Sequence, residues 1–243
     1  MATYNGERFV RDQLETILSQ LPPDAEVIVA DDGSTDRSLK IIEAVGDSRV
    51  RILPEGPHLG PIYNFERALK EAKGDVIFLS DQDDAWIPGK VQLMLDALGF
   101  DGATFETNAP WLAVHDAIFM DSAGDPLTSI NRFSQYMTMW SRRPYKRGVF
   151  RNWMKNSYTG CCMAFRKELL KFALPFPKNL PMHDQWLGLV AERKNRVVAI
   201  PQSLILYRIH ENNATHLVGG KPCGFVQRLK WRWNLLRSLL SRT

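Results

Sequence analysis

Short apolar runs alternate with helical patterns through the first 100 residues, and this alternation limits the fold more than any other feature. Runs typical of buried strands stand at residues 27–30, 50–53 and 76–79. Patterns typical of helices occupy residues 8–20, a stretch that ends near residue 44, and residues 62–72 and 89–98. This alternation predicts an α/β fold with a mainly parallel central sheet and helices on both of its faces.

The chain beyond residue 100 is less regular but still carries apolar runs. We expect strands at residues 112–120, 161–165, 197–200 and 204–208. We expect short helices at residues 167–172 and 184–193. At 243 residues, the chain is long enough for one large domain with its own hydrophobic core.

Two clusters of carboxylates stand where predicted strands end. Asp31 and Asp32 follow the run at 27–30, whereas Asp81, Asp83 and Asp84 follow the run at 76–79. The carboxyl ends of parallel strands form the rim on which α/β sheets bind ligands. Closely spaced carboxylates repel one another unless a positive group lies among them, and hard oxygen ligands suit Mg²⁺ or Mn²⁺. This rim is therefore the predicted ligand site.

Two simpler interpretations of these carboxylates stay open. The cluster at 81–84 could be a solvated acidic turn, although a second acidic turn on the same rim weakens that interpretation. Asp31 and Asp32 could serve only to cap a helix. In that turn Ser34 or Thr35 is available as N-cap, with Asp36 in the first helical turn.

The net charge of +4 comes from the end of the chain. Residues 221–243 contain six basic residues and no acidic one, which leaves 25 basic and 27 acidic residues in the body. A body without net positive charge argues against binding to nucleic acid. No apolar run approaches a membrane span, no signal peptide opens the chain, and three cysteines make no disulfide framework. We expect a cytoplasmic protein.

Six motifs, in this order, resemble those of the family 2 glycosyltransferases with the A-type nucleotide-sugar-binding fold. They are Ala-Thr-Tyr-Asn-Gly at 2–6, Asp-Asp-Gly-Ser-Thr-Asp at 31–36, Asp-Gln-Asp-Asp at 81–84 before Trp86, Thr-Gly-Cys at 159–161, His-Asp-Gln-Trp at 183–186 and Tyr-Arg-Ile-His at 207–210. The Asp-Gln-Asp-Asp version is most similar to the rhamnosyltransferase branch. The resemblance implies a glycosyltransferase domain at 1–215, with a nucleotide-sugar half at about 1–100 and an acceptor half at about 101–215.

The resemblance also assigns roles on the donor side. Tyr4 would lie against the nucleotide base, and Asp32 would accept a hydrogen bond from a base edge, with Asp31 beside it. Asp81 would lie near the ribose or the sugar. Asp83 would ligate a metal ion, Mg²⁺ or Mn²⁺, that bridges the diphosphate. Asp84 receives no role. The implied donor is a dTDP- or UDP-sugar.

On the acceptor side, the resemblance makes Asp184 the general base of an inverting transfer to a hydroxyl of a glycan or a lipid-linked acceptor. Spacing alone favours Asp184 as the N-cap of the following helix. His183 would orient its neighbour. His210 could meet the metal or the diphosphate, but it could equally be a surface residue after a strand.

Aromatic and basic residues of the second half carry weaker signals. Trp140, Trp153 and Trp186 could shape a sugar platform, or they could pack in the core or in an interface. The basic residues between Arg142 and Arg151 could meet a phosphorylated lipid acceptor, or they could form a solvated loop.

The segment 216–243 is predicted to form a basic amphipathic helix. Apolar side chains share one arc of about 100°, namely those of Phe225, Val226, Leu229, Trp233, Leu236 and Leu240. Basic helices with Trp and Leu bind anionic membrane surfaces. Peripheral contact with the inner face of the cytoplasmic membrane through 225–240 and packing on a protein surface are both open.

One departure from the family leaves two rival functions. The family has an apolar strand immediately before the Ala-Thr-Tyr-Asn segment, and here Met1 stands at that point, so we expect the central strand to be missing and its neighbours' backbone groups to be unpaired. A damaged, non-catalytic nucleotide-sugar-binding protein is then an alternative. A sugar nucleotidyltransferase is a second alternative, but it needs a glycine-rich phosphate loop, which residues 5–7 do not supply.

Overall fold

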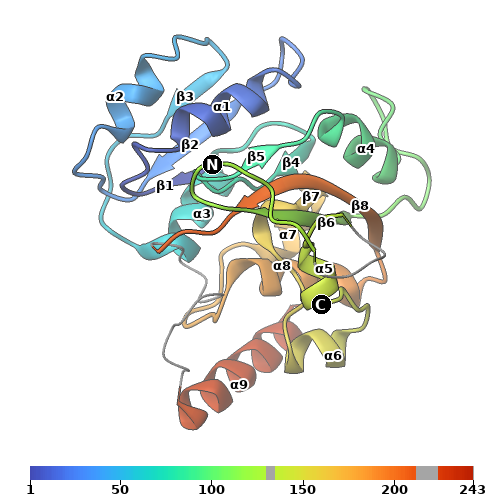
Figure 1. Ribbon diagram of the computed structural model, residues 1–243. Coiled ribbons are helices and arrows are strands. Elements are labelled where there is room, and N and C mark those ends of the chain that lie inside the picture. Colours follow the sequence, from blue (N-terminus) through green and yellow to red (C-terminus); the bar gives the residue numbers. More distant parts are fainter. Residues whose placement is uncertain (130–134, 212–223, 243) are drawn as a thin grey trace.

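The computed structural model describes residues 1–129, 135–211 and 224–242 (Figure 1). A first sheet contains three parallel strands in the order β1-β2-β3, which are Ala2–Thr3, Val27–Asp31 and Val50–Ile52. A second sheet has the order β4-β7-β6-β8-β5, which are Val76–Phe78, Met163–Arg166, Leu112–Met120, Val197–Arg208 and Ala85–Trp86. The predicted α/β class, with helices around a central sheet, is confirmed.

Strand direction in the second sheet differs from the mainly parallel pattern that alternation predicts. β6 and β8 pair in parallel, whereas the pairs β4–β7, β6–β7 and β5–β8 are antiparallel. No helix separates β4 from β5, and antiparallel strands need no helical crossover between them. The runs at 197–200 and 204–208, which we expected as two strands, form one strand, β8.

The first strand is short and lies within the motif at 2–6. Ala2 pairs with Ala30 and Thr3 with Asp31. The Ala2 N–H also donates to the Ser80 carbonyl at 3.2 Å, so the two sheets meet beside the turn that follows β4. Ala2 and Thr3, the first residues of the motif at 2–6, therefore form a two-residue strand that pairs with the end of β2.

Helices form where apolar residues recur at helical spacing. They are α1 (Val10–Leu18), α2 (Ser38–Glu43), α3 (Gly60–Glu71), α4 (Lys90–Ala97), α5 (Met139–Arg142), α6 (Val149–Met154), α7 (Leu170–Ala173), α8 (His183–Arg193) and α9 (Phe225–Ser241). Pro61 lies in the first turn of α3, where its missing N–H costs nothing. The predicted cap of α2 is wrong: its N-cap is Arg37, and Asp36 precedes the helix and accepts a hydrogen bond from the Ser38 N–H.

Alternate residues of the strands face opposite layers of helices. In β2, Val27 and Val29 pack in the cluster that contains the apolar face of α1, whereas Ile28 and Ala30 pack with Ala68 of α3. The helices α3, α7 and α8 cover the second face of the sheets, and α9 packs farther out against α6 and α8 (Figure 1). The strand ends and their acidic turns are thereby held between two packed layers.

The three tryptophans lie in structural positions. Trp186 is fully buried, and its indole N–H donates to the Ala173 carbonyl at 2.9 Å. The Trp153 indole N–H donates to the Arg232 carbonyl of α9 at 2.8 Å. Trp140 stacks on Tyr145 with ring centroids 5.6 Å apart. For Trp186 and Trp153 these contacts match the core and interface interpretations rather than a sugar platform.

Helix α9 packs on the body of the protein. Leu235 and Leu239 are buried in the cluster that includes α8, and the Arg232 guanidinium donates to the Met154 carbonyl at 2.9 Å. The predicted helix is confirmed, while the side chains of Phe225 and Val226 and residues 216–223 of the expected segment lie outside the described part. Within the described ranges, no helix is both long and apolar enough to cross a bilayer.

Candidate active site

The turn after β2 is tied together by the carboxylate of Asp31. One oxygen accepts hydrogen bonds from the Gly33 and Ser34 N–H groups, and the other accepts from the hydroxyls of Thr3 and Ser34. A carboxylate offers about four acceptor positions, so Asp31 has none left for a ligand. We therefore reassign Asp31 from nucleotide contact to support of the turn.

Two N-terminal motifs meet at this turn. The Asn5 side-chain oxygen accepts from the Thr35 N–H at 2.8 Å, and the Asn5 N–H donates to the Ser34 hydroxyl at 2.8 Å. The Gly6 N–H donates to the Ser38 hydroxyl at 2.7 Å. The segment that carries Tyr4 is thus anchored to the end of β2 by side chains about 30 residues away in the chain.

Asp32 is buried beside the loop that begins α3. Its carboxylate accepts from the N–H groups of Leu59 and Gly60 at 2.7 and 2.9 Å, and the His58 Nδ1 lies 3.0 Å from it. The rings of His58 and Tyr4 are 5.1 Å apart, and both side chains are exposed. Asp32 therefore retains one acceptor position next to an open aromatic pair. His58 has no role that the sequence could predict, because a single histidine in a loop rich in Gly and Pro residues matches no binding motif.

Gln82 connects the nucleotide side to the acidic turn. Its side-chain oxygen accepts from the Tyr4 N–H at 2.8 Å, and its amide nitrogen donates to the Tyr4 carbonyl at 2.9 Å. A Cβ at Gly6 would collide with this amide, so the close approach requires glycine there. Gln82 lies inside the motif at 81–84, and sequence reasoning missed its role because that role depends on a partner 78 residues away.

The charges of Asp83 and Asp184 both act on Asp81. Burial, together with the charges of Asp83 and Asp184, raises the pKa of Asp81 to about 7. Asp83 contacts the second half of the chain directly, because its Oδ2 lies 2.8 Å from the Nε2 of His210. The structure thus brings together one carboxylate cluster and one histidine that are separated by more than 120 residues.

Asp84 belongs to the supporting structure beneath this cluster. It accepts a hydrogen bond from the Arg208 N–H at 3.1 Å, which fastens the end of β8 to the acidic turn. Burial and the charges of Asp83 and Asp81 raise the pKa of Asp84 well above its usual range. The ammonium of buried Lys90 supplies positive charge nearby and donates to the Cys161 carbonyl at 2.7 Å.

Among the described residues, one group of acidic and sulfur side chains brings its possible ligand atoms close enough together to hold a metal ion. It consists of Asp81, Asp84 and Cys161. Burial and a hydrogen bond with Cys162 raise the pKa of the Cys161 thiol, so it resists becoming a thiolate ligand. A carboxyl and a thiol whose pKa values are both raised, close to the buried Lys90, are poor ligands for a hard divalent cation. The pair Asp83 and His210 is the better candidate.

Asp184 lies in the first turn of α8, whose N-cap is Met182. The N-cap interpretation of Asp184 is therefore wrong. Its Oδ1 accepts from the Asn156 amide at 3.1 Å and from the Gln185 N–H at 2.5 Å. Burial raises the pKa of Asp184 to about 6, although the Gln185 N–H and the charge of Arg143 act in the opposite direction.

His183 is buried beside this carboxylate without a polar partner. Its ring stacks on Phe65 with centroids 4.3 Å apart, and neither ring nitrogen has a hydrogen bond within the described structure. Burial lowers the pKa of His183 to about 3, so the ring is neutral. A neutral ring packed in this way fits a structural position beside Asp184, whose carboxylate is held by Asn156 and the Gln185 N–H instead.

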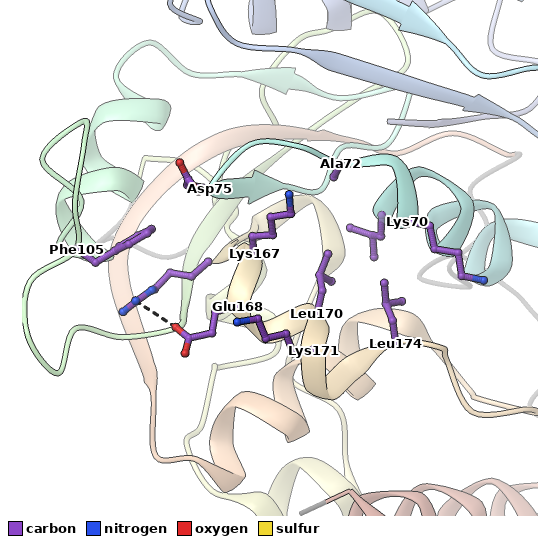
Figure 2. Close-up of a pocket in the computed structure, with 11 residues that line it drawn as sticks. Lys70, Ala72, Asp75, Phe105, Lys167, Glu168, Leu170, Lys171 and Leu174 are labelled. Atoms are coloured by element: carbon purple, nitrogen blue, oxygen red, sulfur yellow. Dashed lines mark ion pairs between the residues drawn. The ribbon is translucent and has the colours of Figure 1, made fainter.

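One cavity lies away from these motifs. It encloses about 600 Å³ and is lined by residues that include Asp75, Phe105, Arg166 and Glu168 (Figure 2). Asp75 precedes β4, whereas Asp81 follows that strand, so the cavity lies at the opposite end of β4 from the acidic turn. It contains none of the motif residues.

Comparisons with known proteins show which proteins this chain is similar to over most of its length. The family described as Glycosyl transferase family 2 matches residues 1–173. The dTDP-rhamnosyl transferase RfbG of Shigella flexneri is 29% identical over 229 residues, which cover 88% of this chain and 72% of that protein. The putative teichuronic acid biosynthesis glycosyltransferase TuaG of Bacillus subtilis is 22% identical over 87% of this chain and 78% of that protein.

Solved structures show the same fold. TarS 1-349 of S. aureus, in complex with UDP-GlcNAc, superposes with a TM-score of 0.68 at 18% identity, over 99% of this chain and 64% of that one. The mannosyltransferase PcManGT of Pyrobaculum calidifontis, in complex with GDP-Man and Mn²⁺, gives 0.63 at 19% identity, over 87% and 56%. This chain spans about two thirds of TarS 1-349 and a little over half of PcManGT.

The raised pKa values of Asp81 and Asp184 predict that stability falls as pH rises. A buried carboxyl whose pKa is higher in the folded than in the unfolded state stabilises the fold while it is protonated, and this contribution is lost as pH passes the folded pKa of about 6 to 7. With divalent ions chelated, we expect the free energy of unfolding to fall by about 4 kcal/mol between about pH 5 and pH 8. Urea unfolding of the wild type and of Asp81→Asn measures this. The variant should show a weaker pH dependence, and a flat wild-type profile would contradict the assignment.

Proposed function

The chain belongs to glycosyl transferase family 2, and on this premise we propose that it transfers rhamnose from dTDP-rhamnose to a hydroxyl of a cell-surface glycan or of a lipid-linked acceptor. It is a nucleotide-sugar glycosyltransferase with the A-type fold. Rhamnose is supported by the similarity to RfbG over most of the chain and by the Asp-Gln-Asp-Asp motif. The transfer proceeds with inversion, and a carboxylate accepts the proton of the attacking hydroxyl.

The nucleotide base lies against the exposed ring of Tyr4, beside His58. Aromatic rings bind a planar base by stacking, and the two rings leave that surface open. The remaining acceptor position of Asp32 receives the imide N–H of thymine or uracil. Gln82 holds the backbone of Tyr4 in place, so the base-binding residue and the acidic turn keep one geometry.

Asp83 and His210 would hold the divalent ion, Mg²⁺ or Mn²⁺. A carboxylate is an ordinary ligand of both ions, whereas an imidazole suits transition metals and so favours Mn²⁺. The Asp83 and His210 side chains are 14% and 11% exposed, so they face a partly enclosed space. The crowding that raises the pKa of Asp81 is relieved when a cation lies nearby. A bound ion supplies positive charge that stabilises the departing nucleoside diphosphate. Asp81 lies next to these ligands and faces the sugar or ribose.

Asp184 acts as the general base, and its raised pKa beside the acidic turn is the observation that carries the proposal. At pH 7 a carboxylate with a pKa of about 6 is ionised, yet it binds a proton more readily than an ordinary aspartate. The Asn156 amide orients it, and the Arg143 charge prevents its pKa from rising further. The acceptor hydroxyl loses its proton to Asp184 as its oxygen attacks the anomeric carbon.

The two rival functions have less support. The family match is to glycosyltransferases, which supports a catalytic product over a non-catalytic one. Residues 5–7 do not supply the glycine-rich phosphate loop of a nucleotidyltransferase, and the backbone of the adjacent Tyr4 is bonded to the Gln82 side chain instead. The transferase is therefore the function we propose.

Asp184→Asn tests the base. The amide keeps the size of the side chain but cannot accept the proton, so kcat should fall by about 10²–10⁴-fold while donor binding is retained. The wild-type rate should decline below pH 6, where Asp184 becomes protonated. Release of dTDP from dTDP-rhamnose, with and without acceptor, measures both effects. Asp75→Asn, an exposed aspartate at the far end of β4, is the matched control, and equal rates for the two variants would refute the assignment.

The metal site is tested by binding rather than by turnover. Asp83→Ala removes a direct ligand, so Mn²⁺ affinity measured by electron paramagnetic resonance should weaken by about 10-fold or more. Asp84→Asn is the control, because the Asp84 carboxyl accepts a hydrogen bond from the Arg208 N–H and is not one of the proposed ligands. Strong loss in Asp84→Asn with normal binding in Asp83→Ala would place the ion in the deeper cluster instead.

A further inference from the structure

Exposed apolar side chains gather on two helices remote from the nucleotide side. Of the eight large hydrophobic residues that are exposed in the described structure, five lie on α6 or α9. They are Phe150, Met154, Leu229, Trp233 and Leu240. Phe150 is 74% exposed and Trp233 is 65% exposed, which is unusual for side chains of this size. We call these five residues the apolar patch.

Docking of α9 leaves this patch uncovered. The helix is held to the body by Leu235 and Leu239, which occupy one of its faces. Leu229, Trp233 and Leu240 belong to a different arc of the same helix and remain exposed. The contacts of Arg232 with Met154 and of Trp153 with Arg232 fasten α6 beside α9, so the two helices present their apolar residues together.

The two segments that carry the apolar patch are rich in basic residues and contain no acidic residue. Residues 139–156 contain six basic residues and no acidic one, and residues 224–242 contain five basic residues and no acidic one. Arg142, Lys146, Arg151, Lys230 and Arg237 are exposed. Apolar side chains flanked by exposed cations form the surface that inserts shallowly into a bilayer whose headgroups are anionic.

We propose that α6 and α9 together bind the surface of an anionic lipid bilayer. Phe150, Trp233 and the leucines enter the boundary between headgroups and acyl chains, while the basic residues contact lipid phosphates. A second copy of the chain is a poor occupant, because a symmetric contact would bring two strongly basic surfaces against each other. The inference does not depend on the identity of the transferred sugar.

The same surface lies next to the proposed base. Helix α6 ends at Met154, and Asn156, two residues later, donates to the Asp184 carboxylate at 3.1 Å. Gln185, adjacent to Asp184, donates to the Asn152 carbonyl within α6 at 2.6 Å. An acceptor held in the bilayer would therefore reach the protein beside the group that takes its proton.

Vesicle flotation of the full chain tests the proposal. Protein should float with vesicles that contain phosphatidylglycerol and should remain unbound with vesicles of phosphatidylcholine alone, and added salt should weaken the binding. The double variant Phe150→Ser, Trp233→Ser should partition at least about 10-fold less, because two large apolar side chains no longer enter the bilayer. Lys230→Glu with Arg237→Glu should lose the preference for phosphatidylglycerol. Leu93→Ser, at an exposed apolar position on α4, is the control and should float as the wild type does.

All substituted side chains are exposed, so circular dichroism and thermal unfolding should match the wild type and separate lost binding from misfolding. Absence of flotation with phosphatidylglycerol, or flotation unchanged in the Phe150→Ser, Trp233→Ser variant, would overturn the proposal. Sedimentation equilibrium supplies the remaining outcome. A wild-type dimer that this double variant converts to monomer would assign the patch to a second copy instead.

Discussion

Repulsion among carboxylates that share a poorly solvated space is the constraint on which the rest of this structure depends. Asp81 and Asp83 come from the turn after β4, and Asp184 comes from α8 more than 100 residues later. Their mutual repulsion, added to burial, raises the pKa of Asp81 to about 7. The fold tolerates this arrangement because two packed helical layers fix the turns. In addition, the positive charge of Lys90 acts on Asp81 and that of Arg143 acts on Asp184.

Acidic residues that are adjacent in the sequence have different roles in this site. Asp31 uses every acceptor position to hold its own turn, whereas Asp32 keeps one position next to the Tyr4 ring. Asp84 bonds the end of β8, while Asp83 faces His210. In each turn, one carboxylate stabilises the backbone and the other remains available for a ligand. Gln82 then links the two turns, so that the donor side behaves as one unit.

The elements and the location of the rim could be predicted from the sequence, because they depend on local periodicity and on strand ends. The antiparallel strands β5 and β7 and the continuity of β8 depend on pairing between distant residues, which no local pattern records. The same reason explains why Asp31 and Asp32 could not be told apart. Their roles are decided by Thr3 on one side and by Leu59 and Gly60 on the other. Trp186 likewise has a motif position but a core environment.

The central claim is that carboxylates from both halves of the chain share one site, and titration of the individual aspartates tests it most directly. Carbon-13 NMR of the metal-free protein should give Asp81 a pKa of about 7 and Asp184 a pKa of about 6. Because the charge of Asp184 contributes to the first value, Asp184→Asn should lower the pKa of Asp81 measurably, whereas Asp75→Asn should leave it unchanged. An Asp81 that titrates near 4 in the wild type, or whose pKa is indifferent to Asp184, would contradict the account.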